Sequence, residues 1–252
     1  MTAAHLVPAP FGGGEDMGMD ERQPSVAAVA RRAVLVFAES VELDLNRRRF
    51  PAFFKKLFDI SWIDGAATSA DVHLFTSRSG KQHAAFTIHR QVGDSFGARL
   101  EAAVEKLSQL GYDQIAIVGR DCPHLATSDV TEAFNRLGDH RLVLGPDHRG
   151  GCYLIALATC DRHLLRGIRW KRNTDFAQFG DRLPSGKLSV LPVKQDLDSW
   201  ADVKSLARAG DLLSEFFLKV FAFANTETEF FVDLAAQRTR VRGQMPPPAL
   251  AA

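Results

Sequence analysis

The sequence has few cysteines and no excess of charge of either sign. Three of its 252 residues are cysteine, Cys122, Cys152 and Cys160, and no pair has CxxC spacing. An odd, scattered set of cysteines argues against a disulfide framework and a structural zinc site, and it favours a reducing compartment. Lysine and arginine number 31 against 30 for aspartate and glutamate. The basic excess typical of proteins that bind nucleic acid is therefore missing.

Long apolar runs are also missing. No stretch reaches the roughly 18 apolar residues that a membrane span needs, and residues 1–30 do not combine a basic start with an apolar core. We therefore expect no signal peptide and no membrane span, and we expect a cytoplasmic protein.

The apolar content is sufficient for one large core. With 46% hydrophobic residues, we predict one domain over residues 32–209. The Pro- and Gly-containing segment 1–31 is expected to be a flexible leader, and 238–252 a disordered tail. Between domain and tail, the Phe-rich segment 210–237 predicts helices that pack on the domain. Alternatives for this segment are a homodimer contact or a contact with a membrane surface.

Short apolar runs alternate with amphipathic stretches, a pattern that predicts an α/β fold with helices on both faces of a sheet. A helix is predicted over 95–110, with a stop at Gly111, and two more helices should begin at Thr127 and Ser199. Thr127 is the expected cap of its helix, and Asp202 should complete a capping box with Ser199. The expected strands are 33–37, 72–75, 115–118, 142–144, 152–157 and 189–191.

Acidic residues follow two of the predicted strands. Asp121 leaves the strand 115–118 at a turn that contains Gly119 and Pro123, and Asp196 and Asp198 follow the strand 189–191. In an extended chain, residues at i and i+2 point to the same side, so the pair can flank a Mg²⁺ or Mn²⁺ ion. The alternatives are that Asp121 only bonds turn amides and that the pair only precedes a helix cap.

Two glycine-containing loops offer backbone amides to a ligand. Gly93 and Gly97 lie at the start of the predicted helix 95–110, where an anion can bind and Arg99 can assist. The alternative is a glycine loop that only opens the helix, with Arg99 on the helix surface. Gly150 and Gly151 connect two predicted strands, as a hairpin or as a crossover loop, with or without a ligand.

Taken in order, these segments resemble a bacterial family of GT-A-like glycosyltransferases of the radical-SAM/selenodomain-associated transferase type. The resemblance covers residues 32–206 and implies a Rossmann-like three-layer αβα sandwich of the nucleotide-diphospho-sugar transferase type. It is carried by the following pieces: AVLVFA (33–38), QVGDSFGARL (91–100), GRDCP (119–123), LGP (144–146), GGCYLI (150–155), GIRW (167–170) and DLD (196–198).

The resemblance implies a site for a nucleotide or nucleotide sugar. Asp121 and Asp198 would be the catalytic residues, and together with Asp196 they would hold Mg²⁺ or Mn²⁺. The ion would neutralise a diphosphate leaving group. The ligand would contact Phe37, Ala38, Gln91, Gly93, Gly97, Arg99, Gly119, Pro123, Gly150 and Gly151.

The chain departs from the family pattern in three places. Segment 39–49 lacks the family's glycine and lysine phosphate loop, Arg149 replaces an aspartate before the paired glycines, and Lys171-Arg172-Asn173-Thr174 follows Trp170 in place of Ser-Thr. The leading hypothesis is a metal-dependent nucleotide-sugar transferase. The alternatives are a nucleotidyltransferase and a catalytically inactive GT-A-like protein for binding or assembly.

Overall fold

A computed structural model describes residues 29–39, 70–77, 86–199 and 201–202 of the chain. The leader up to residue 28, the segment 40–49 expected at the phosphate loop, the predicted C-terminal helices and the predicted tail lie outside these residues. Within the described part, no helix has the length and apolar character that crossing a membrane requires.

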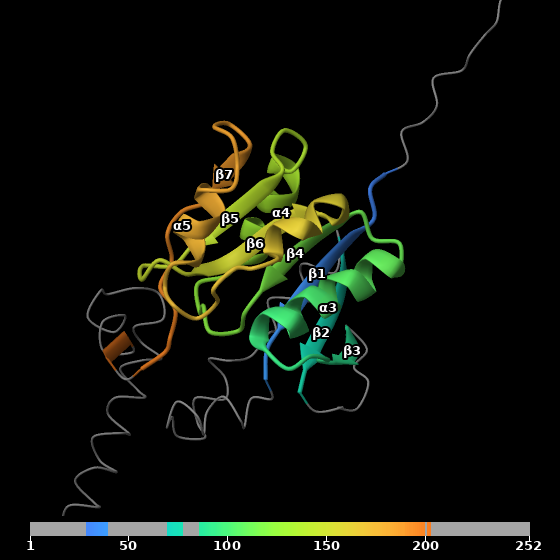
Figure 1. The fold of residues 1–252 in the computed structure, drawn as a ribbon, viewed down its shortest axis with the longest axis horizontal. Coiled ribbons are helices and arrows are strands. Elements are labelled where there is room, and N and C mark those ends of the chain that lie inside the picture. The colour runs from blue at the N-terminus through green and yellow to red at the C-terminus, as the bar shows by residue number, and fades with distance from the viewer. Residues whose placement is uncertain (1–28, 40–69, 78–85, 200, 203–252) are drawn as a thin grey trace, which may run out of the picture.

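A seven-stranded sheet forms the centre of the described structure, in the order β3-β2-β1-β4-β6-β5-β7 (Figure 1). Six neighbour relations hold it together, and only those of β6 are antiparallel, to β4 and to β5. The strands are β1 (Arg32–Phe37), β2 (Asp71–Thr76), β3 (Thr87–Arg90), β4 (Gln114–Val118), β5 (Leu142–Pro146), β6 (Cys152–Ala158) and β7 (Leu188–Val190).

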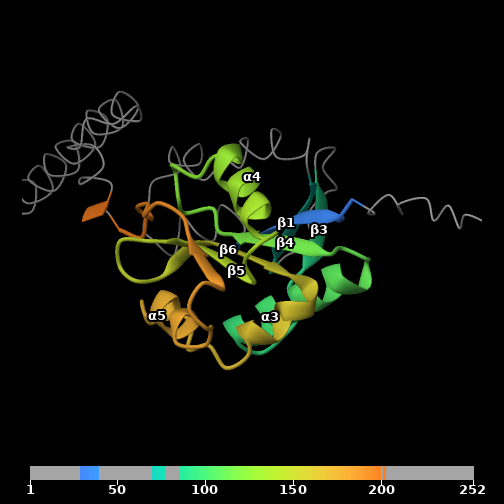
Figure 2. The same ribbon diagram turned by 90° about the horizontal axis from the view of Figure 1, so that it is seen from above.

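Helices cover both faces of the sheet, which confirms the predicted three-layer αβα sandwich. Helix α4 (Thr127–Arg136) lies on one face, and α3 (Phe96–Gln109) and α5 (Asp175–Gly180) lie on the other (Figure 2). The 3-10 helix η2 (Thr159–Leu165) follows β6 and packs against α3.

Alternating strand residues supply the two halves of the core. Val34 and Val36 face the α4 side, where they join Phe134, whereas Leu35 faces the α3 side and joins Val104 and Leu107. All of these side chains are at most 1% exposed. Because β1 is buried on both faces, its sequence is a continuous apolar run rather than an alternating one.

The helices α3 and α4 begin where the sequence placed them, at residues 95–96 and at Thr127, and one expected cap differs. Ser95, the first residue of the predicted helix 95–110, is the cap of α3, since its Oγ accepts from the Ala98 N–H at 3.1 Å. Ser199 and Asp202 form the predicted reciprocal pair: the Asp202 carboxylate accepts from the Ser199 N–H at 2.7 Å, and Ser199 Oγ accepts from the Asp202 N–H at 3.4 Å.

The expectation that Thr127 caps its helix was wrong. Ala126 occupies the cap position with an extended backbone, and Thr127 is the first helical residue. Asp129 satisfies the free amide, because its carboxylate accepts from the Ala126 N–H at 2.8 Å. At this helix start, the Asp129 carboxylate therefore accepts a backbone hydrogen bond, whereas the Thr127 hydroxyl was expected to accept one.

Candidate functional site

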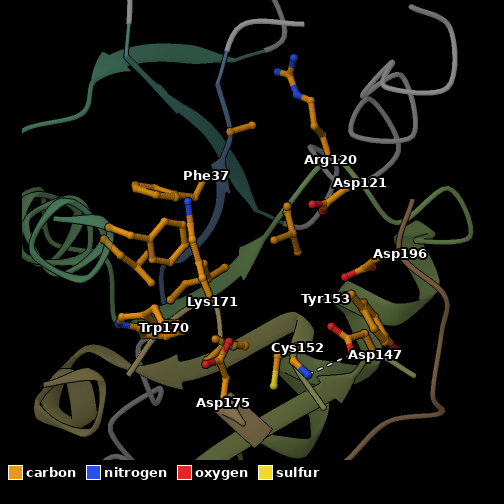
Figure 3. A pocket seen from close by; sticks show the side chains of 18 of the residues that line it. Phe37, Arg120, Asp121, Asp147, Cys152, Tyr153, Trp170, Lys171, Asp175 and Asp196 are labelled. Carbon is orange, nitrogen blue, oxygen red and sulfur yellow. Dashed lines mark hydrogen bonds between the residues drawn. The ribbon is translucent and has the colours of Figure 1, made fainter. Parts of the chain in front are cut away.

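A cavity of about 540 Å³ opens at the carboxyl ends of β1 and β4. Its walls come from these strand ends, from the first turn of α3, from the β5–β6 hairpin and from residues 170–175 (Figure 3). Ligands bind at this edge in open α/β sheets, because the loops that leave parallel strands meet there. The cavity is therefore the candidate functional site.

Asp121 reaches the cavity from the loop that follows β4. Its carboxylate folds back over Gly119, so that a side chain at position 119 would collide with it. A side chain at position 119 would therefore displace the Asp121 carboxylate from its place. The sequence predicted a carboxylate here, and the structure places it on the cavity wall.

Asp196 and Asp198 lie beside Asp121, although they follow a different strand. The Leu197 N–H donates to the Asp121 carbonyl at 2.7 Å, which joins the two segments by their backbones. Asp196 and Asp198 both line the cavity, as the i and i+2 pattern predicted. The three acidic side chains named from the sequence thus converge on one cavity and form its acidic edge.

Arg149 binds two carboxylates at this edge. Its guanidinium donates to Asp198 at 2.7 Å and forms a second ion pair with Asp202. These contacts raise the pKa of Arg149, the hydrogen bond to Asp202 being the larger cause. Where the family pattern has an acid, this chain therefore has a cation that joins Asp198 to Asp202.

The predicted ligand-binding residues divide into two groups. Six of them line the cavity: Phe37, Ala38, Gln91, Arg99, Gly119 and Gly151. Gln91 is buried and its side-chain amide donates to the Phe75 carbonyl at 2.9 Å. Four others are not among the lining residues: Gly93, Gly97, Pro123 and Gly150.

Two of the non-lining glycines have local packing roles. A side chain at Gly97 would collide with the indole of Trp170, and one at Gly150 would collide with the Asn173 carbonyl. Both glycines therefore allow the segment 170–173 to approach. They shape the cavity without lining it.

An aromatic wall faces the acidic edge. Phe37 and Phe96 meet edge to face with ring centroids 5.2 Å apart, and Phe96 lies 5.6 Å from Trp170. The ammonium of Lys171 lies 4.7 Å from the centroid of the Phe96 ring. Figure 3 shows Phe37, Trp170 and Lys171 together on one side, with Asp121 and Asp196 across the cavity. Sequence reasoning singled out Phe37 but assigned no ligand contact to Phe96, Trp170 or Lys171.

Arg99 extends from the first turn of α3 into the cavity wall. Its Nε is buried and donates no hydrogen bond to any described residue. A buried donor without a partner is costly, so the group is suited to a ligand that brings an acceptor. That Arg99 binds an anion stays a prediction.

A second pair of carboxylates lines the cavity floor. Asp147, just after β5, accepts from the backbone N–H groups of Arg149 at 2.6 Å and Gly151 at 2.9 Å. Asp175, at the start of α5, has its pKa raised to about 6 by burial and by the nearby charge of Asp147. Sequence reasoning missed Asp175, because nothing in its local sequence distinguishes it from a helix-initiating aspartate.

The acidic edge fits a divalent cation that shares its ligands with phosphate oxygens. No group of three or more His, Cys, Asp and Glu side chains in the described residues is arranged to hold a metal by itself. Mg²⁺ is nevertheless commonly held by one or two carboxylates together with the phosphates of a substrate. Asp121 and Asp196 line the cavity and have the chemistry for this, and Asp198, which also lines it, forms an ion pair with Arg149.

The fold is of the α/β type found in nucleotide-diphospho-sugar transferases. A proposed nucleotide-diphospho-sugar transferase from Desulfovibrio desulfuricans G20 has a TM-score of 0.61 and 20% identity, covering 73% of this chain and 89% of that one. The manganese complex of Rv0371c from Mycobacterium tuberculosis H37Rv has a TM-score of 0.51 and 12% identity, covering 70% and 98%. At these identities the likeness shows the fold alone.

The family comparison agrees with the resemblance found in the sequence. Residues 64–172 match DUF2064, a family described as an uncharacterized protein conserved in bacteria. Together with the fold, this match confirms the resemblance to a GT-A-like bacterial family. No curated protein matches the sequence.

Proposed function

We propose that this chain binds a nucleoside diphosphate sugar in the cavity and transfers the sugar to an acceptor. The observation that carries the proposal is the convergence of Asp121 and Asp196 opposite an aromatic wall, with Arg99 and Lys171 also lining the space. An aromatic surface suits a nucleobase, and cationic side chains suit its phosphates. The cavity volume of about 540 Å³ is in the range of small-molecule sites.

A divalent ion is the second part of the proposal. When bound, Mg²⁺ or Mn²⁺ neutralises charge on a diphosphate leaving group. The manganese complex of the M. tuberculosis protein with a similar fold supports this choice. On the protein side, Asp121 and Asp196 would hold the ion, and Arg149 would keep Asp198 in place at the edge.

The test is calorimetric titration of the full chain with UDP, GDP, CDP and ADP, each with and without Mn²⁺. We expect one nucleotide to bind, and we expect Mn²⁺ to strengthen its binding. In the Asp121→Asn variant, the gain in nucleotide affinity caused by Mn²⁺ should fall by about 10–100-fold or more. Removal of a residue that only contacts a metal ligand already costs about 10–100-fold in metal affinity.

The control is Asp139→Asn, which removes an exposed carboxylate beyond the end of α4. It should bind like the wild type. If the wild-type chain binds none of the four nucleotides, the proposed function is wrong. If it binds one equally well with and without Mn²⁺, only the metal part is wrong.

A nucleotidyltransferase has the same needs for base, phosphate and metal, so the cavity alone does not separate it from a glycosyltransferase. The reactions differ in the product. A nucleotidyltransferase consumes a nucleoside triphosphate and releases pyrophosphate, whereas a glycosyltransferase releases a nucleoside diphosphate. Incubation with each triphosphate and a sugar 1-phosphate, followed by a pyrophosphate assay, distinguishes them. A chain that binds nucleotides and forms neither product has the binding role of the inactive alternative.

A further inference from the structure

We propose that Asp175 is a catalytic residue that accepts the proton of an incoming hydroxyl group, in a subsite that it shares with Asp147. The inference rests on the proposed function and adds to it the side of the cavity at which the acceptor enters. Neither residue belongs to the acidic edge formed by Asp121, Asp196 and Asp198.

The fold brings the two carboxylates to one wall from separate segments. Asp147 follows β5, and Asp175 begins α5. The Phe176 N–H donates to the Gly150 carbonyl at 3.2 Å, which ties α5 to the β5–β6 hairpin. Both aspartates line the cavity, on either side of Cys152 in Figure 3.

The two carboxylates differ in how they are satisfied. One oxygen of Asp147 accepts two backbone hydrogen bonds, from Arg149 and Gly151, which fix its orientation. Asp175 accepts a bond from the Lys171 backbone N–H, but its Oδ1 is buried and accepts none from any described residue. A buried acceptor without a donor, on the wall of a cavity, is suited to a ligand that brings a donor.

A hydroxyl group is that donor in the proposed reaction. As the acceptor oxygen forms a bond to the sugar carbon C1, the bond from C1 to the phosphate oxygen breaks. The electron pair of the broken bond leaves with the nucleoside diphosphate, and the hydroxyl proton moves to Asp175 Oδ1. Asp147 orients the hydroxyl.

The environment of Asp175 suits a proton acceptor that works near neutral pH. Burial and the charge of Asp147 raise its pKa to about 6, while the Lys171 amide acts in the opposite direction. The Cys152 thiol on β6 also faces the pair, and burial together with Asp175 and Asp147 raises the pKa of that thiol, so it stays neutral. A base is most effective when its pKa lies near the working pH.

The experiment measures transfer of sugar to water, which needs no identified acceptor. UDP-glucose, GDP-mannose, ADP-glucose and CDP-glucose are incubated with the full chain and Mn²⁺, and released nucleoside diphosphate is measured across pH 4.5–8.5. We expect Asp175→Asn to lower the rate at least about 100-fold, the lower end of what general base catalysis contributes. Affinity for the nucleoside diphosphate should stay within about two-fold, because the phosphate-binding residues lie elsewhere.

Two further variants separate a catalytic role from a structural one. Asp175→Glu keeps a carboxylate and should recover part of the rate with a shifted pH profile. Asp181→Asn, at the other end of α5, removes an exposed carboxylate and should behave like the wild type. The wild-type rate should fall as the pH drops below about 6, the value to which the pKa of Asp175 is raised.

If the chain binds a nucleoside diphosphate and Asp175→Asn releases it at the wild-type rate, the role of Asp175 is wrong while the proposed function stands. If the chain binds no nucleotide, both are wrong. The remaining case is a chain that binds the nucleotide but transfers no sugar to water. It is tested by a measurement that needs no turnover. In a chain labelled with ¹³C at aspartate carboxyl groups, the Asp175 signal, identified by Asp175→Asn, should move when the nucleotide sugar is added but not with the nucleoside diphosphate. A signal that does not move overturns the proposal.

Discussion

The molecule has two polar clusters at opposite ends of its central strands, and they are built differently. At the amino-terminal end, Tyr112 donates to Asp71 at 2.6 Å and contacts His73 Nε2 at 2.9 Å, while His73 Nδ1 contacts His89 at 2.9 Å. Burial, the larger cause, and His89 lower the pKa of His73 to about 4, so the ring is neutral. Every polar atom of the His73 side chain thus has a protein partner.

The cavity at the carboxyl end has the opposite character. Arg99 Nε and Asp175 Oδ1 are buried there without a partner among the described residues. Native proteins rarely tolerate this, because each such group loses its bonds to water without replacement. A satisfied network stabilises the fold, whereas unsatisfied groups around a cavity mark the place where a ligand completes the bonding. This difference, together with charge, favours the carboxyl end as the candidate functional site.

The largest expected effect concerns Arg99. Arg99→Gln should weaken binding of the nucleoside diphosphate about 10–100-fold, because a hydrogen bond to a charged group contributes about 1.5–3 kcal/mol and each 1.4 kcal/mol is tenfold. Arg166→Gln makes the same charge change at an exposed position outside the cavity and should not alter the affinity. Calorimetry on both variants checks the comparison. Equal affinities would mean that the unpartnered Nε has no ligand.

A smaller effect, on stability alone, is expected at the cluster around Tyr112 and His73. Tyr112→Phe should lower the free energy of unfolding by about 1–3 kcal/mol, because buried His73 Nε2 loses its hydrogen-bond partner. The second tyrosine of the chain is the matched control. Tyr153 has one bond, to the Pro192 carbonyl at 3.0 Å, and Tyr153→Phe should cost less. Urea denaturation measures both, and an equal or reversed order would show that the His73 network is not a stabilising unit.

The smallest expected effect is a gain in stability at Asp175. Its pKa is raised from 3.8 to about 6, so the folded state binds more protons than the unfolded state between these two values. The stability linked to this raised pKa is therefore present at low pH and lost as the pH rises through about 6. Asp175→Asn should raise the melting temperature by a few degrees at pH 7.5 and leave it unchanged near pH 4. A melting temperature that falls at pH 7.5 would show that the charged form is stabilised rather than strained.

Much of the fold follows from local sequence. Apolar runs located six strands, helical spacing of apolar residues located α3, and Ser199 with Asp202 marked a capping pair by the chemistry of their side chains. Strand β3 was missed, because Thr87–Arg90 is short and lacks an apolar run. Its place comes from pairing with β2, in which His73 lies beside Thr87. Such a strand is set by its neighbour, not by its own residues.

The acidic edge, like the six apolar strands, was predictable from local sequence, whereas the cavity floor was not. Asp121 and Asp196 each follow an apolar strand, so their positions in the sequence are enough to indicate a shared edge. Asp175 and Trp170 lie in a segment that reaches the cavity only because Gly97 and Gly150 allow it to approach. That approach depends on contacts between residues distant in sequence. No local pattern contains this information.

The most direct test of the account is a crystal structure of the chain with Mn²⁺ and the nucleoside diphosphate that binds in the titration. The account predicts an anomalous Mn²⁺ peak at the carboxylates of Asp121 and Asp196, a phosphate oxygen within hydrogen-bond distance of Arg99 Nε, and the base against Phe37, Phe96 or Trp170. A nucleotide bound outside this cavity, or bound within it with Arg99 still lacking an acceptor, would contradict the account.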